Sequence, residues 1–274
     1  MPIAKLDDIE IYYGIEGEGP PILFIGGLSA GQQLWAPVLE HLKHEYKCIT
    51  FDNRGIGESS KPPKGYTIPD LTQDALGLID SLSISRPHVV GMSMGGLIAQ
   101  NMALQRPKAV GCLILVGSFA KTSSRGDLVQ ETRKILQKCL QPYEYFLVQA
   151  TWMFGPKTLR KSGFAEKYAR TAADNPHPQA KHAFEQLAEG VSQFDTREQL
   201  KNISQPTLVL VGEDDIMATP SQSRVLAQGI PGAEMEVLPE MGHFCTVMEG
   251  AKELAERVDR FIKRADGGSS SRSI

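Results

Sequence analysis

A serine between glycines is the clearest chemical feature of this sequence. Ser93 lies at the centre of Gly91-Met92-Ser93-Met94-Gly95, after the β-branched run 89–90 and before a helix-forming run that begins at Leu97. A strand, a tight turn and a helix in that order strain the central residue, and the flanking glycines leave room for neighbouring chain. The hydroxyl then lies at a helix N-terminus, where unpaired amides and the helix dipole favour negative charge. The pattern predicts a nucleophile at Ser93, with an ordinary small-residue turn as the alternative.

A serine hydroxyl is a weak nucleophile, so it needs a base and a group that orients the base. Of the six histidines, His243 is the one that follows a strand of the predicted sheet, in a loop at the sheet edge where Ser93 lies. We therefore predict His243 as the base, and a solvated loop histidine is the alternative.

Three consecutive carboxylates follow the strand that ends at Val211. They are Glu213, Asp214 and Asp215, and the last of them occupies the place in the turn that projects toward the histidine loop. This favours Asp215 as the orienting acid, ahead of Asp214 and then Glu213. An acid after the preceding strand would be another arrangement, but residues 117–120 contain none.

Attack on a carbonyl also requires two donors for the oxygen that becomes negative. The backbone amide of Met94, directly after the nucleophile, is the first predicted donor. The second is expected in the glycine loop after the run 22–25, at the amide of Leu28. Gly26-Gly27 in this loop lets the backbone approach a substrate closely, and a purely structural turn is the alternative.

The elements that must position these groups alternate along the chain. Residues 3–15 predict two short strands around a turn at Asp7-Asp8. Apolar runs typical of strands buried on both faces then alternate with helical patterns. These runs are 22–25, 47–51, the run before Ser93, 110–116, 206–211 and 233–238. Such alternation predicts the α/β class, with a mostly parallel sheet and helices on both faces.

One segment departs from this alternation. Residues 119–205 contain no convincing β-branched run and predict helices at 128–140, 143–153 and 179–191. An all-helical insertion there would cover the carboxyl ends of the strands, where open α/β sheets bind ligands. We therefore predict a core in two parts (1–118 and 206–265), a helical cap (119–205) and a disordered tail (266–274) rich in glycine and serine.

The order of elements and four segments resemble the α/β-hydrolase superfamily, over residues 1 to about 265. The segments are Asp52-Asn53-Arg54-Gly55-Ile56-Gly57-Glu58-Ser59, Gly91 to Gly96, Pro206 to Asp215, and Gly242-His243. Within the superfamily the chain is similar to small capped esterases, enol-lactonases of the 3-oxoadipate type and cofactor-free haloperoxidase-like proteins.

The resemblance implies bracing roles for Asp52 and Arg54, which we expect to form an ion pair. Two departures from the family pattern affect the site. Gly26-Gly27 stands where members usually carry His-Gly, so an imidazole that helps brace the oxyanion loop is missing. The spacing from Asp215 to Thr219-Pro220 is one residue longer than is common.

The reaction predicted from these residues is hydrolysis of a carboxylic ester or lactone through a Ser-His-Asp acyl-enzyme mechanism. Carbon–carbon bond hydrolysis, thioester hydrolysis and acyl transfer to another acceptor use the same triad. A ligand receptor that retains the triad is the alternative from a different class. A serine nucleophile argues against haloalkane dehalogenase and epoxide hydrolase relatives, which attack with an aspartate.

The predicted cap supplies candidates for substrate contacts. Five side chains could line an apolar acyl pocket, or alternatively form the core of the cap: Phe119, Trp152, Met153, Phe154 and Phe184. Arg160, Lys161 and Arg170 could bind one carboxylate, and a solvated helix face is their alternative.

The composition of the chain limits the kinds of partner that we expect it to bind. The formal net charge of −3 comes from interspersed signs, and no aromatics alternate with Arg or Lys, so nothing indicates nucleic-acid binding. The first residues lack the pattern of a signal or transit peptide, and no apolar run has the length of a membrane helix. The four cysteines are scattered, which indicates neither a zinc site nor a disulfide framework. We expect a cytoplasmic enzyme that needs no metal or organic cofactor and binds a small molecule rather than a membrane.

Overall fold

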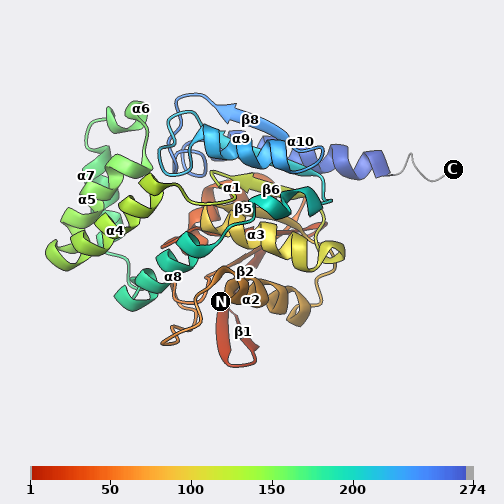
Figure 1. The fold of residues 1–274 in the computed structure, drawn as a ribbon, viewed down its shortest axis with the longest axis horizontal. Helices are drawn as coiled ribbons and strands as arrows, with labels where there is room; N and C mark the ends of the chain where they lie inside the picture. Colours follow the sequence, from red (N-terminus) through yellow and green to blue (C-terminus); the bar gives the residue numbers. More distant parts are fainter. Residues whose placement is uncertain (1, 270–274) are drawn as a thin grey trace.

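The computed structural model describes residues 2–269 and shows the predicted α/β architecture (Figure 1). Within that range eight strands form one sheet in the order β1-β2-β4-β3-β5-β6-β7-β8. The β1–β2 and β2–β4 pairs are antiparallel, and the other neighbours are parallel. The strands are β1 (Ile3–Leu6), β2 (Ile9–Glu16), β3 (Pro21–Ile25), β4 (Lys47–Phe51), β5 (His88–Met92), β6 (Leu113–Val116), β7 (Thr207–Gly212) and β8 (Glu234–Leu238).

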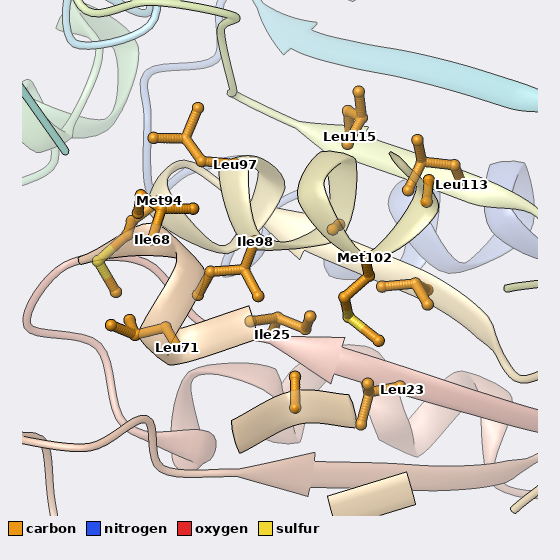
Figure 2. Close-up of a cluster of buried hydrophobic side chains, with 14 of the residues drawn as sticks. Leu23, Ile25, Ile68, Leu71, Met94, Leu97, Ile98, Met102, Leu113 and Leu115 are labelled. Carbon is orange, nitrogen blue, oxygen red and sulfur yellow. The ribbon is translucent and has the colours of Figure 1, made fainter. Parts of the chain in front are cut away.

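Helices cover both faces of the sheet. Helices α1 (Ala36–Leu42) and α10 (Ala251–Ser269) pack on one face, and α2 (Ile68–Ser81), α3 (Met94–Gln105) and α9 (Pro220–Gly229) pack on the other. Successive side chains of a strand point to opposite faces. In β3, Leu23 and Ile25 therefore pack toward α3, whereas Ile22 and Phe24 pack toward α1 and α10. Figure 2 shows the first of these cores, where side chains of α2 and α3 meet those of β3 and β6.

The sequence prediction differs from the structure at several helix ends. The sequence predicts a helix over residues 71–82, whereas α2 begins three residues earlier, at Ile68, because Thr67 and Asp70 form a capping box. Helix α10 continues to Ser269, so the predicted disordered tail is wrong for residues 266–269. The remaining part of that prediction, residues 270–274, lies outside the described residues.

A run of helices separates β6 from β7 and gathers at one side of the molecule (Figure 1). Helices α4, α5 and α8 correspond to the three predicted helices, while α6 and α7 were not predicted. We refer to α4–α8 as the cap: α4 (Ser124–Cys139), α5 (Pro142–Met153), α6 (Pro156–Leu159), α7 (Phe164–Ala173) and α8 (Lys181–Gln193). A bridge between Lys121 and Asp195 joins the two chain segments that lead into and out of it.

The sequence places Cys48 and Cys112 inside apolar runs typical of strands, which predicts that both are small buried hydrophobic residues. Cys48 and Cys112 are buried, and burial raises the pKa of both thiols to about 12, as expected for small apolar core residues.

Among the helices of residues 2–269, none combines the length and apolar character needed to cross a bilayer.

Candidate active site

Ser93 occupies a strained turn between β5 and α3. Its backbone angles are φ 54° and ψ −118°, a positive φ that is uncommon outside glycine. The turn depends on its glycines, because a Cβ at Gly95 would collide with the carbonyl oxygen of Ile25, and one at Gly91 with that of Gly95. The strand, turn and helix predicted around Ser93 are therefore present.

A buried acid–histidine pair forms from two loops. His243 follows β8 and Asp215 follows β7, and the histidine Nδ1 lies 2.7 Å from the aspartate Oδ2. Both side chains are almost fully buried. Asp215 Oδ1 accepts the backbone N–H groups of Met217 and Ala218, each at 2.8 Å, which fixes the carboxylate. Of the three adjacent acids, Asp214 lies instead against Gly155, and Glu213 accepts the Glu240 N–H.

The segment after β6 connects this pair to Ser93. The Ser93 N–H donates to the Val116 carbonyl at 3.0 Å, and the Ser118 hydroxyl donates to the Ser93 carbonyl at 2.9 Å. Gly117, between Val116 and Ser118, lies directly against the acid–histidine pair. A Cβ added to this glycine would be 3.0 Å from Asp215 Oδ2 and 3.3 Å from His243 Nδ1. The three predicted catalytic residues thus lie at the same edge of the sheet, around the segment Val116-Gly117-Ser118. No hydrogen bond joins Ser93 Oγ to His243 within residues 2–269, and such bonds often tighten only when substrate binds.

The predicted oxyanion loop lies directly beside the serine. Leu28, Met94 and Ser93 line one small cavity of about 20 Å³, room for about one water molecule. A Cβ at Gly27 would lie 3.2 Å from the Ser93 Cβ, so the glycine permits the close approach. Asn53 Nδ2 donates to the Gly26 carbonyl at 3.2 Å. This amide braces the loop that contains Gly26-Gly27.

The remaining lining of the cavity comes from the cap, its borders and the loop between β7 and α9. It consists of Phe119, Thr122, Gly126, Gln130, Val191 and Met217. Phe119 is therefore the one predicted pocket residue that lines this cavity. Trp152, Met153 and Phe154 belong to a separate apolar cluster, and Phe184 is fully buried beneath the Arg133 guanidinium. Their alternative interpretation, as core of the cap, describes these four better.

The expected ion pair between Asp52 and Arg54 is wrong. Arg54 binds Asp74 with two nitrogens, one of them at 2.6 Å, while Asp52 accepts the N–H groups of Gln32 (2.7 Å) and Glu58 (3.0 Å). Burial raises the pKa of both carboxyl groups above the ordinary range of aspartate. Asp52 thus braces its loop through backbone amides, and Arg54 ties the same loop to α2.

The basic residues named for a substrate carboxylate lie at the surface. Arg160 is exposed, Lys161 pairs with Glu249 at 3.0 Å, and Arg170 lies over the Tyr143 ring. The sequence interpretation missed Arg133, which is 1% exposed although it belongs to a polar helix. No pattern in the sequence separates Arg133 from the solvated arginines of the cap.

A second missed residue joins the serine turn to both ends of the cap. Gln100 Nε2 donates to the carbonyls of Gly96 and Phe119, each at 3.0 Å. Its Oε1 accepts the Thr196 hydroxyl at 2.8 Å. The hydrogen bonds of Gln100 to Phe119 and Thr196 become visible only in the folded structure. Nearly all of α3 is buried, so the spacing of its residues does not mark Gln100 in the sequence.

One group of potential metal ligands exists among the described residues: His88, Cys112 and Asp266. It lies at the start of β5, the end opposite Ser93. His88 Nδ1 already accepts the Cys112 N–H at 3.1 Å, and burial lowers the pKa of this histidine. The group therefore has no geometric connection to the serine site.

Comparison with known proteins extends over core and cap together. A family model described as "alpha/beta hydrolase fold" matches residues 20–247. "Putative carbamate hydrolase RutD" of Azorhizobium caulinodans is 30% identical over 237 residues, which cover 86% of this chain and 88% of that protein. The enol-lactonase from Burkholderia xenovorans LB400 has a TM-score of 0.86 at 28% identity, covering 96% of this chain and 100% of its own. Est816, an N-acyl homoserine lactone degrading enzyme, has a TM-score of 0.82 at 28% identity, covering 95% and 100%.

Proposed function

The chain belongs to the α/β-hydrolase fold family, and from that premise we propose that it is a serine hydrolase that cleaves a carboxylic ester or lactone. The observation that carries this proposal is the buried pair of Asp215 and His243. The pair lies against Gly117 at the end of β6, where the Val116 carbonyl accepts the Ser93 N–H. The lactone-cleaving enzymes of similar structure support the substrate class. Residues 119–205 would act as the cap that selects the substrate.

In this mechanism His243 Nε2 accepts the Ser93 proton while Oγ attacks the carbonyl carbon. The oxygen that becomes negative accepts hydrogen bonds from the amides of Leu28 and Met94. His243 then protonates the leaving alcohol oxygen as its bond to carbon breaks. Water then attacks the acyl-enzyme carbonyl with the same histidine as base, and the histidine returns the proton to Ser93 Oγ as its bond to the acyl carbon breaks and the carboxylic acid leaves. Asp215 holds the proton on Nδ1 and stabilises the imidazolium.

Replacement of the nucleophile tests this function. We expect Ser93→Ala to lower turnover of p-nitrophenyl acetate by at least about 10³-fold and to abolish labelling by a fluorophosphonate probe. Ser85→Ala, an exposed serine at the other end of β5, is the matched control and should retain both. Circular dichroism and thermal melting establish that the variants fold. Undiminished turnover by Ser93→Ala would contradict the proposal.

Carbamate hydrolysis is the second candidate, favoured by the relative named a carbamate hydrolase. The same serine, histidine and amides would act, because a carbamate carbonyl also passes through a tetrahedral intermediate. A panel of p-nitrophenyl esters, lactones and N-alkyl carbamates separates the two. A higher kcat/KM for carbamates than for esters, lost in Ser93→Ala, would assign carbamate hydrolysis.

A further inference from the structure

Arg133 is a cation enclosed by the cap. Its guanidinium is 1% exposed and stacks on Phe184, 4.6 Å from the ring centroid. Nε donates to the Tyr145 hydroxyl at 3.0 Å, Nη1 to the Gln130 side-chain oxygen at 3.0 Å, and Nη2 to the Ser29 hydroxyl at 3.3 Å. A helix of a soluble protein normally turns such a side chain toward water.

All of these acceptors are neutral. No carboxylate of residues 2–269 lies within 4.0 Å of the guanidinium, although buried charges are normally paired. An arginine keeps its charge and has five N–H groups, of which three are used here. Gln179, whose oxygen accepts the Ser29 hydroxyl, has a buried Nε2 without a partner. The surroundings thus contain more donors than acceptors, which suits an anion.

Two contacts connect this group to the serine. Gln130, which accepts from Nη1, lines the same cavity as Ser93. Ser29, which accepts from Nη2, is two residues from Gly27, and Gly27 approaches the Ser93 side chain. Two residues span at most about 7 Å of extended chain. Arg133 therefore lies within reach of a short substrate whose carbonyl is at Ser93.

We propose that Arg133 binds a carboxylate on the acyl part of the substrate, so that the enzyme selects anionic esters or lactones over neutral ones. This proposal rests on the proposed serine hydrolase function. The carboxylate replaces the neutral oxygens of Gln130 and Ser29 on the guanidinium, because charge-assisted hydrogen bonds are the stronger ones. A fork of two parallel N–H groups also fixes the direction of the acyl chain relative to Ser93.

A pair of esters of equal chain length isolates the charge. Mono-p-nitrophenyl glutarate carries a terminal carboxylate, and p-nitrophenyl valerate has the same number of carbons without it. For the wild type we expect kcat/KM to be about 10- to 100-fold higher for the glutarate ester. The succinate and adipate monoesters, each with its neutral counterpart, show which chain length fits.

Variants then assign the preference to one residue. In Arg133→Met, which keeps the volume and removes the charge, we expect the glutarate-to-valerate ratio to fall to about that of the uncatalysed reaction. Arg133→Lys keeps the charge without the fork and should retain part of the ratio. Arg160→Met, at an exposed cap arginine, is the matched control and should keep the wild-type ratio.

The outcomes separate this inference from the function on which it depends. A wild type without preference at any chain length overturns the role of Arg133, even if Ser93 is labelled by the fluorophosphonate. A wild-type ratio in Arg133→Met overturns it as well. If neither Arg133 variant folds, the wild-type chain-length series still decides. Turnover that survives Ser93→Ala would instead overturn the hydrolase proposal itself.

Discussion

Two parts of the cap differ in what they bury. The apolar half (α5–α7, residues 142–173) buries an apolar cluster with Ala150, Met153 and Phe154, beside the buried polar side chains of Gln149 and Thr158. The polar half (α4, residues 124–139) buries Gly126 and Arg133. Two of its large apolar side chains face outward instead, Leu128 at 67% and Ile135 at 61% exposure.

The two halves also join the core differently. The apolar half contacts the histidine loop, since the Phe244 N–H donates to the Met153 carbonyl at 2.8 Å and the rings of Phe154 and Phe244 lie 6.0 Å apart. The polar half reaches the predicted oxyanion loop through the hydrogen bond of Arg133 to Ser29.

This difference separates two requirements of catalysis. A base must keep its position within fractions of an ångström, and apolar packing supplies that rigidity because any displacement opens a cavity. Side chains that bind a substrate must give up contacts within the protein when the substrate arrives. Hydrogen bonds to neutral protein groups can be replaced in this way by hydrogen bonds to the ligand. The apolar half therefore suits the support of His243, and the polar half suits contact with substrate.

The largest expected effect concerns the pair that the apolar half supports. Asp215→Asn should lower kcat by about 10³- to 10⁴-fold. Oδ1 is held by the amides of Met217 and Ala218, so the new NH₂ group would face His243 Nδ1 and favour the tautomer with a proton on Nε2. Steady-state kinetics with p-nitrophenyl acetate measure the loss. Asp214→Asn is the control, and an equal loss there would contradict the assignment of the acid.

The next effect compares the two halves directly. Phe154→Ala should lower the free energy of unfolding by about 3–5 kcal/mol, because it empties the space between Phe164, Tyr168 and Phe244. Leu128→Ala on the polar half should change it by less than about 0.5 kcal/mol. Urea denaturation measures both values. Similar losses in the two variants would remove the distinction drawn between the halves.

The smallest effect tests the polar contact with the predicted oxyanion loop. Ser29→Ala removes the acceptor of Arg133 Nη2 and the donor to Gln179, while it leaves the apolar packing intact. We expect kcat to fall about 3- to 10-fold through a less well positioned Leu28 amide. Ser221→Ala, an exposed serine on α9, serves as control. Unchanged kcat in Ser29→Ala would show that the polar half does not position the loop.

The sequence was sufficient for features encoded by neighbouring residues. The turn at Ser93 requires glycines close to it in the chain, and the alternation of apolar runs with helical patterns predicts the α/β fold. The order of elements also identified His243 as the histidine at the strand ends that Ser93 occupies. Their catalytic roles remain predictions.

The tertiary structure alone decided which distant side chains meet. Arg54 pairs with Asp74 and not with Asp52, and three predicted pocket residues pack against the histidine loop instead of lining the Ser93 cavity. Arg133 has the same chemistry as the exposed arginines of the cap, yet packing against Phe184 and Tyr145 buries it. Backbone preferences act over a few residues, so the sequence shows them. The partner of a side chain depends on which remote elements pack around it, and only the assembled fold determines that.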